Sequence, residues 1–337
     1  MKICVLGAGT WGCALASLLT KNGHEVKLWS AIGAELDALR INGEHPKLPG
    51  AIMPVGIEYT EDIGYAIGGC AAVLFVVPSE FIRATAARAA EYILPEMILI
   101  NAAKGIEAAT LMPMTEVIRD ELIKCRGSND YRIVALSGPT HAEEVAIGLP
   151  TSIVSACEDT ETSLEVAYMF RNSCMRVYTN TDVVGVELCG AMKNIIAIAA
   201  GINRGVEFGD NAAAMLMTRG IAEIMRLGVA MGARRETFIG LAGIGDLRVT
   251  ATSRHSRNHR CGVLIGQGKS YAEAKAEIGM VIEGYHALTA AIRLSDKYGI
   301  ELPITRAVYD VMINGKAPYP VIRELMSRDI KDETVMY

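Results

Sequence analysis

The sequence lacks the features that mark membrane-spanning, secreted and nucleic-acid-binding chains. No run of 18 apolar residues is free of charge, because the nearest approach, residues 186–202, contains Glu187 and Lys193. The apolar run at residues 2–6 is too short for the hydrophobic region of a secretory signal. No long basic run occurs, and 33 basic against 38 acidic residues give a formal net charge of −5. We therefore expect no membrane span and no nucleic-acid partner.

Cysteine pairs of the form Cys-x-x-Cys are also absent. Most of the eight cysteines stand inside apolar runs, where a free thiol behaves as a small hydrophobic group, so we expect reduced core thiols and a cytoplasmic location. His255 and His259 stand four residues apart without a Glu between them or a third ligand in view. We therefore expect no metal site.

What the chain does contain is enough apolar material for two domains. The chain has 337 residues, more than one hydrophobic core usually holds, and 51% of them are hydrophobic. No repeat or low-complexity tract interrupts it, and no Ser/Pro-rich linker separates its halves. We expect the two halves to pack directly and to leave a cleft.

The first half alternates short apolar runs with amphipathic stretches such as residues 11–21 and 35–41. The strand-like runs are residues 2–6, 25–29, 72–77, 97–101, 132–136 and 151–155. Continuous apolar strands separated by helices predict a mostly parallel sheet that is covered on both faces. We predict a Rossmann-type, doubly wound α/β domain over residues 1–183.

The second half shows almost no strand signal, and we predict an all-α domain over residues 184–337. The helix-compatible stretches are residues 185–202, 212–231, 271–278, 284–298 and 304–313. Pro318 and Pro320 then precede a last short helix, expected at residues 321–327.

A glycine-rich turn, Gly7-Ala8-Gly9-Thr10-Trp11-Gly12, follows the first strand and opens a helix. Gly7 permits the tight turn, Gly9 lets a pyrophosphate approach the backbone, and Gly12 lets the helix pack on the strand. A tight turn that serves packing alone would leave Gly9 unexplained. The turn predicts a dinucleotide cofactor bound at a helix N-terminus.

The identity of that dinucleotide depends on the end of the second strand. An acidic residue there binds the ribose diol of NAD, and a basic one accommodates the 2′-phosphate of NADP. Residues 28–32 contain neither, although Ser30 could bond a ribose hydroxyl. We expect NAD or NADP, with NAD favoured.

Lys193 and Asn194 interrupt an otherwise apolar helix. A buried ammonium is costly unless it is paired, so one interpretation is a lysine that extends to the helix surface. The other places Lys193 in the cleft as a general acid/base, held by Asp246.

Other polar residues follow strands or form a basic cluster. Lys104 and the Ser137-Gly138-Pro139-Thr140 segment stand just after predicted strands, where ligands bind in open α/β sheets. A solvated Lys104, and a helix cap at Thr140, are the simpler alternatives. Three arginines within residues 254–260 suggest recognition of a small anion, unless they form a solvated loop.

These segments together resemble the NAD-dependent glycerol-3-phosphate dehydrogenase family, in its soluble bacterial form. The resemblance spans almost the whole chain. It rests on residues 7–12, 104–107, 137–139, 193–194, 245–247, 256–258 and 281–284. It departs at residues 30–32, where NADP-preferring members usually carry a basic residue.

The resemblance implies a cytoplasmic, homodimeric oxidoreductase that interconverts dihydroxyacetone phosphate and sn-glycerol 3-phosphate for phospholipid synthesis. Lys193 would be the proton acceptor in the oxidation direction, and Lys104 would touch both cofactor and substrate. The cofactor residues are Gly7, Gly9, Thr10, Trp11, Gly12, Lys104, Ala142, Arg257, Val281 and Glu283. The substrate residues are Lys104, Gly138, Thr140, Lys193, Asn194, Asp246, Thr250, Ser256, Arg257 and Asn258.

Two other functions are compatible with parts of this pattern. A dehydrogenase with the same two-domain plan could place a hydroxy-acid carboxylate on Arg257. A non-catalytic redox sensor could bind the dinucleotide and present the helical half to a partner, but Lys193 and Asp246 would then have no task.

Overall fold

The structure, a computed structural model, describes residues 1–330 and 332. The remaining positions of the predicted 184–337 domain, 331 and 333–337, lie outside the described residues. Contacts divide the chain into two compact units. The first contains Met1–Lys104 and Met112–Val183, and the second contains Gly105–Leu111 together with the chain from Val184 onward. Residues 105–111 thus belong with the helical unit although they stand within the first half of the sequence.

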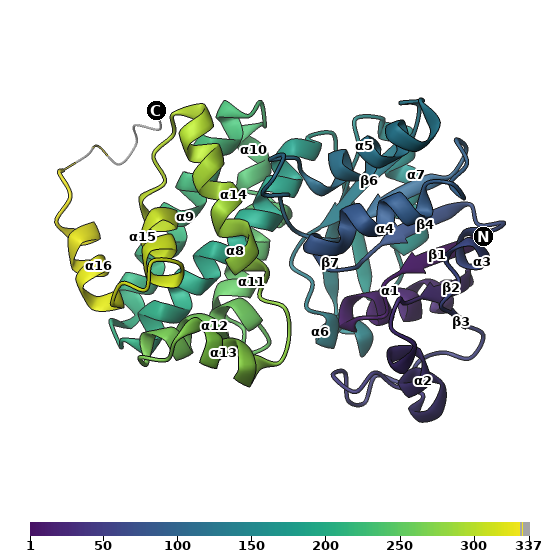
Figure 1. The fold of residues 1–337 in the computed structure, drawn as a ribbon, viewed down its shortest axis with the longest axis horizontal. Coiled ribbons are helices and arrows are strands. Elements are labelled where there is room, and N and C mark those ends of the chain that lie inside the picture. Colours follow the sequence, from purple (N-terminus) through teal and green to yellow (C-terminus); the bar gives the residue numbers. More distant parts are fainter. Residues whose placement is uncertain (331, 333–337) are drawn as a thin grey trace. The chain divides into compact units, whose positions relative to one another are not determined.

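An eight-stranded sheet forms the centre of the first unit (Figure 1). Its strands are β1 Lys2–Leu6, β2 Glu25–Trp29, β3 Glu58–Thr60, β4 Ala72–Phe75, β5 Ile98–Asn101, β6 Arg132–Ser137, β7 Thr151–Ala156 and β8 Met175–Asn180. Their spatial order is β3-β2-β1-β4-β5-β6-β7-β8, and every neighbouring pair is parallel except β6 with β7. The order reverses direction at β1, which is the doubly wound arrangement that the sequence predicts.

Helices cover both faces of this sheet. Alternate residues of β1 enter different cores: Ile3 and Val5 pack in one, Cys4 and Leu6 in the other. Because both faces are buried, the central strands are mostly apolar. The helical segments are α1 Thr10–Lys21, α2 Gly33–Asn42, α3 Ile63–Ile67, η1 Ser79–Phe81, α4 Ile82–Ala89, α5 Met114–Arg126, α6 Ala142–Ala146 and α7 Thr160–Phe170. The predicted fold class is confirmed for this unit.

The second unit is helical throughout its described part. Its helices are α8 Val183–Gly205, α9 Gly209–Ala230, α10 Arg235–Phe238, the π-helical turn η2 Leu241–Gly245, α11 Asp246–Thr252, α12 Arg257–Gly266, α13 Tyr271–Ile278, α14 Glu283–Tyr298, α15 Pro303–Met312 and α16 Pro318–Met326. One expectation about them is wrong, because α16 begins at Pro318 rather than after both prolines. The first turn of a helix tolerates proline, since its N–H groups have no acceptor within the helix.

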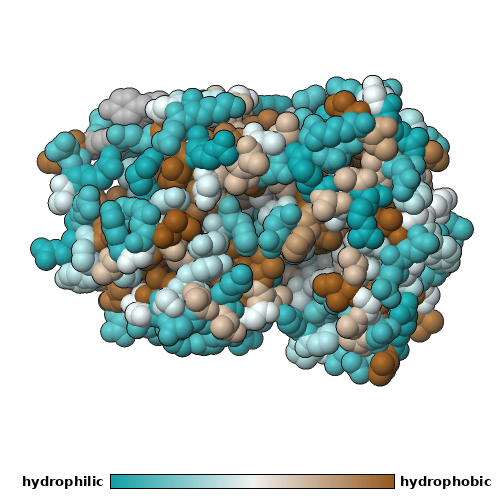
Figure 2. All heavy atoms as spheres, in the orientation of Figure 1, coloured by the Kyte–Doolittle hydropathy of each residue, from teal (hydrophilic) through white to brown (hydrophobic). Residues whose placement is uncertain are grey.

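Helix α8 forms the core of the second unit. By length and composition it would pass as a membrane span, with a mean hydropathy of 1.7 over an 18-residue window. That window is 89% buried inside the unit, as in the core helix of a soluble protein. Hydrophilic side chains cover most of the face seen in Figure 2, with apolar ones scattered among them.

Glycines bring α12 directly against α8. A Cβ atom on Gly201 of α8 would overlap the His259 carbonyl oxygen, and one on Gly262 of α12 would overlap the Ile198 carbonyl oxygen. The two backbones therefore touch without side chains between them. This contact helps to place the beginning of α12 in the part of the helical unit that contains the polar residues of α8.

Candidate active site

The glycine-rich turn has the geometry that its sequence predicts. Gly7 adopts a φ of +126°, and its N–H donates a hydrogen bond to the Trp29 carbonyl oxygen at 2.9 Å. A Cβ atom on Gly12 would overlap the carbonyl oxygen of Gly7. The first residue therefore needs glycine for its conformation, and Gly12 needs it for close packing.

Gly9 leaves room for a ligand. It is the N-cap of α1, and a Cβ atom built on it would have no neighbour within 4 Å. The first N–H groups of a helix lack acceptors within the helix and attract anions. An open position beside those N–H groups fits the pyrophosphate of a dinucleotide, which a side chain on Gly9 would obstruct. Ala142 begins α6, which packs against α1.

The end of β2 differs from the expectation about Ser30. Its hydroxyl is engaged within the protein, because it donates to the Glu35 carboxylate at 2.7 Å and accepts from the Ile32 N–H at 3.1 Å. This carboxylate comes from α2, beyond residues 28–32, so the prediction for the end of β2 missed it. An acidic residue in the first turn of the helix after β2 was the signal that could have identified it.

The predicted residues after β5 and β6 lie together in the first unit. The Lys104 Nζ donates to the Gly138 carbonyl oxygen at 3.0 Å, and the Thr140 hydroxyl donates to the same oxygen at 3.1 Å. Gly138 adopts a φ of +153°, which favours glycine. The helix expected to begin at about Thr140 begins at Ala142 instead, with His141 as its N-cap, so the capping interpretation of Thr140 is wrong.

Lys193 is buried within the second unit. Its side chain donates to Asp246 Oδ1 at 2.7 Å and to Thr250 Oγ1 at 2.6 Å. Residue exposures are only 6% for Lys193, 1% for Asp246 and 4% for Thr250. The interpretation of Lys193 as a surface-reaching lysine is therefore wrong, and the buried charge is paired, as its desolvation requires.

The other two members of this cluster come from one helix face. Asp246 begins α11 directly after the π-helical turn η2, and Thr250 follows four residues later, so both project to the same side. The Thr250 hydroxyl lies 3.4 Å from Asp246 Oδ1 as well as accepting from Lys193. The arrangement holds a buried ammonium group beside a carboxylate and a hydroxyl.

A second polar network links the beginnings of two helices to α8. The Asn258 amide nitrogen donates to Asn194 Oδ1 at 2.9 Å, and Asn258 Oδ1 accepts from the Gly284 N–H at 2.9 Å. The network holds the first turns of α12 and α14 beside Asn194 and so positions Val281 and Glu283, which flank the start of α14. Both the amide nitrogen and the amide oxygen of Asn258 are thus engaged in connecting α8, α12 and α14.

The basic cluster is not one loop. Ser256 caps α12 by accepting from the His259 N–H at 3.2 Å, and Arg257 is the first residue of that helix. Arg257 is half-buried, whereas Arg254 and Arg260 are exposed. One guanidinium at a helix N-terminus, rather than three along a loop, offers positive charge to an anion.

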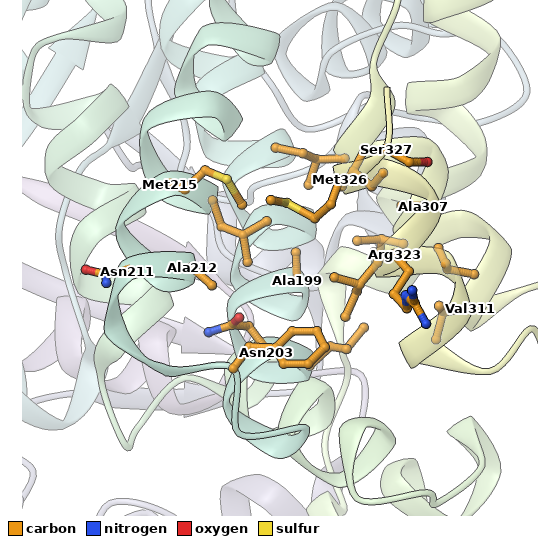
Figure 3. A pocket seen from close by; sticks show the side chains of 18 residues that line it. Ala199, Asn203, Asn211, Ala212, Met215, Ala307, Val311, Arg323, Met326 and Ser327 are labelled. Atoms are coloured by element: carbon orange, nitrogen blue, oxygen red, sulfur yellow. The ribbon is translucent and has the colours of Figure 1, made fainter. Parts of the chain in front are cut away.

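A separate apolar cavity of about 650 Å³ lies in the second unit, between α8, α9, α15 and α16. Figure 3 shows Met215 of α9 and Met326 of α16 extending toward each other, with Asn203 and Arg323 among the lining side chains. None of the predicted site residues lines this cavity.

Comparison with known proteins identifies the family. Residues 2–163 match the model of the NAD-dependent glycerol-3-phosphate dehydrogenase N-terminus, and residues 182–323 match that of its C-terminus. The chain belongs to the NAD-dependent glycerol-3-phosphate dehydrogenase family. The resemblance seen in the sequence is confirmed.

Individual relatives agree with this assignment. The chain is 52% identical over 332 residues to glycerol-3-phosphate dehydrogenase [NAD(P)+] 2 of Lactobacillus delbrueckii subsp. bulgaricus, covering 98% of each chain. The crystal structure of glycerol-3-phosphate dehydrogenase from Coxiella burnetii aligns with a TM-score of 0.92 at 35% identity, over 97% of this chain and 99% of that one. A ketopantoate reductase from Ralstonia eutropha aligns with a TM-score of 0.62 at 18% identity, over 97% and 100% of the chains, which shows a shared fold alone.

Proposed function

We propose that this chain is an oxidoreductase that interconverts dihydroxyacetone phosphate and sn-glycerol 3-phosphate, using NAD or NADP. The observation that carries the proposal is the buried Lys193–Asp246–Thr250 cluster in a chain of this family. Membership alone supports the reaction, and the cluster supports a chemical role for one amine. Supply of glycerol 3-phosphate for phospholipid synthesis is the metabolic role that this reaction supports.

In this proposal Lys193 is the general acid/base. Reduction of the ketone adds a hydride to C2 of dihydroxyacetone phosphate, and the carbonyl oxygen becomes an alkoxide. NADH or NADPH, when bound, supplies that hydride. Lys193 donates a proton to the alkoxide oxygen, which completes the hydroxyl of glycerol 3-phosphate, and in oxidation it accepts the same proton. Asp246 and Thr250 hold the amine in place through the whole exchange.

The substrate phosphate is assigned to the beginning of α12. Arg257 offers a guanidinium fork that matches phosphate oxygens, and the helix N-terminus adds positive potential. Ser256 and Asn258 flank it, but the side chain of Asn258 is committed to Asn194 and Gly284, so we assign it mainly a positioning role. Binding of the distant phosphate would orient the reacting carbonyl.

The two units divide these tasks in the proposal. The domain at residues 1–183 binds the dinucleotide through the glycines of the glycine-rich turn, Thr10, Trp11 and Ala142. The domain at residues 184–337 holds the substrate. Lys104, Gly138 and Thr140 would contact the substrate, with Lys104 touching the cofactor as well. Val281, Glu283 and Arg257 would complete the cofactor site.

We also propose a homodimer formed through the helical unit. The first half of α9 is apolar at residues 212–217, yet none of residues 211–219 is buried. Met326, 62% exposed, lies on α16 beside the apolar cavity that Met215 also lines. A second copy would cover this surface. Light scattering on the purified chain is expected to give twice the mass of one chain, and a monomer would refute the dimer.

A cytoplasmic location is proposed from the thiols. All eight cysteines are free, and six of them are buried. Free thiols suit a reducing compartment.

The experiment that tests the proposed reaction is the oxidation of NADH and of NADPH in the presence of dihydroxyacetone phosphate. We expect rapid oxidation with this substrate and little with 2-keto or 3-keto acids. Preferential reduction of a keto acid would favour the hydroxy-acid alternative, and no turnover with any substrate would favour a redox sensor.

A further inference from the structure

A carboxylate lies at the end of β2 that does not come from that strand. Ser30 directly follows β2, and α2 begins at Gly33. The Ser30 hydroxyl donates to Glu35 Oε2 at 2.7 Å, and Ser30 itself is 4% exposed. The half-buried Glu35 side chain is thereby held at the carboxyl end of β2, although Glu35 belongs to the first turn of α2.

The same carboxylate lies near the glycine-rich turn. Burial, and secondly the charge of Glu35, raise the pKa of the Cys13 thiol to about 12. Cys13 stands in the first turn of α1, directly after Gly12, and its Sγ is hydrogen-bonded to the Ala8 carbonyl oxygen at 3.3 Å. Glu35 is therefore within electrostatic range of the first turn of α1, directly after the glycine-rich turn to which we assign the pyrophosphate.

A dinucleotide that places its pyrophosphate at this turn places its adenosine ribose at the end of the second strand. We propose that Glu35 accepts the ribose hydroxyls there and selects NAD over NADP. This inference rests on the proposed function, since it assumes that the first unit binds a dinucleotide. It assigns to a helix residue the task that an acidic residue at the end of β2 usually performs.

A second carboxylate increases the negative charge at this place. Glu61 lies so close to the start of α2 that a Cβ atom on Gly33 would be 2.7 Å from its Oε1. The 2′-phosphate of NADP carries about two negative charges at neutral pH. It would be repelled by the carboxylates of Glu35 and Glu61, and the ribose diol of NAD would not meet this repulsion.

Three basic side chains of this region offer little compensation. Lys27 of β2 donates to two backbone carbonyl oxygens at 2.8 and 3.0 Å, and Arg40 of α2 is engaged by Asp37 and by a further carbonyl oxygen. Burial lowers the pKa of the His45 imidazole below its ordinary value, so that ring carries little charge at neutral pH. Lys47, two residues after His45, and Arg88, over the Trp29 ring at 5.1 Å, are further basic groups of this region, and the inference requires Glu35 and Glu61 to outweigh them.

A structural task alone could explain Glu35, because an acidic residue in the first turn stabilises a helix. That explanation predicts no effect on the choice between the two dinucleotides. Selection by charge predicts that the effect follows the charge of residue 35 and weakens with salt. The two explanations therefore differ in a quantity that binding measurements give directly.

The experiment is a titration of the full chain with NADH and with NADPH, for the wild type and two variants. Fluorescence of the reduced nicotinamide reports the binding. Glu35→Gln removes the charge and keeps the shape. Glu25→Gln is the matched control, because it removes one exposed carboxylate at the opposite, amino end of β2, where Glu25 lies 3.6 Å from the Lys2 amine. Wild-type binding is also measured at low and high salt, which needs no variant.

We expect the wild type to bind NADH at least about tenfold more tightly than NADPH, the scale of one charge repulsion near a protein surface. Glu35→Gln should narrow this ratio about fivefold or more, chiefly through tighter NADPH binding, and Glu25→Gln should leave it unchanged. High salt should narrow it in the wild type. Equal binding of both, a preference for NADPH, or an unchanged ratio in Glu35→Gln would overturn the inference alone. Binding of neither dinucleotide would overturn the proposed function and this inference with it.

Discussion

Replacement of Lys193 by methionine separates the chemical role of the amine from its structural one. Methionine has a similar length and no charge, so the variant removes the proton donor and leaves Asp246 buried at 1% exposure without the ammonium. If Lys193 is the general acid/base, kcat should fall by about 10² or more. Loss of one partner from a buried ion pair should also cost about 3–5 kcal/mol of stability, since the remaining charge lacks compensation.

A double variant distinguishes these two effects. Lys193→Met with Asp246→Asn removes both charges, so it should recover most of the lost stability and none of the activity. The matched control is Lys316→Met, because Lys316 pairs with Asp310 at 2.9 Å with 53% of its side chain exposed. Such an exposed pair contributes about 1 kcal/mol or less, and turnover should stay at the wild-type level.

The assay follows the oxidation of reduced nicotinamide with saturating dihydroxyacetone phosphate, and thermal unfolding gives the stability of each variant. We expect the single variant to melt about 10 °C below the wild type, taking about 2–4 °C per kcal/mol for a domain of this size. A kcat within tenfold of wild type in folded Lys193→Met would refute the assignment. Restored turnover in the double variant would show that only stability had been lost.

Three further predictions follow from other contacts. Arg257→Ala should raise KM for dihydroxyacetone phosphate at least tenfold with a smaller effect on kcat, and exposed Arg254→Ala should change neither; an unchanged KM in the first variant would place the phosphate elsewhere. Gly12→Ala should abolish tight NADH binding in a fluorescence titration, because its Cβ would overlap the Gly7 carbonyl oxygen, and wild-type affinity would contradict the packing argument. Burial raises the pKa of Glu223 from 4.5 to about 7, so its contribution to stability is present below pH 4.5 and is lost as the pH rises through 7. The lost contribution amounts to about 3 kcal/mol of unfolding free energy. The melting temperature of the wild type, measured relative to that of Glu223→Gln, should therefore fall by roughly 6–12 °C between pH 5 and pH 8. A constant difference between the two melting temperatures would refute the raised pKa of Glu223.

The central strands were predictable because burial on both faces makes them mostly apolar, as in Ala72–Phe75 and residues 98–100. The two edge strands were not. β3 has only three residues, none of them buried, and β8 buries one of its six, so neither leaves an apolar run in the sequence. Edge strands acquire their structure from the neighbour they pair with, which local patterns do not encode.

The polar residues of the site were predictable where they conflict with their surroundings. Lys193 stands out because a charge is costly inside an apolar helix, and burial with Asp246 is the outcome that this cost requires. Glu35 gave only a weak signal, its place in the first turn of the helix after β2, because a glutamate at such a position is ordinary in an exposed helix. Its contact with Ser30 depends on how the chain turns between β2 and α2, which composition does not determine.

Residues 105–111, which belong to the helical unit, make the two halves of this chain hard to separate. Ile106 is buried in the core of the helical unit, and the guanidinium of Arg293 donates to the Ala108 carbonyl oxygen. A cut at residue 183 would therefore remove Ile106 from the core of the helical fragment. The N-terminal fragment would keep residues 105–111, whose apolar side chains would lack the core in which they pack. The covalent path passes from one unit to the other at three places, after 104, 111 and 183. Separating the enzyme into two independent domains would need a replacement loop in place of residues 105–111 as well as the cut at residue 183.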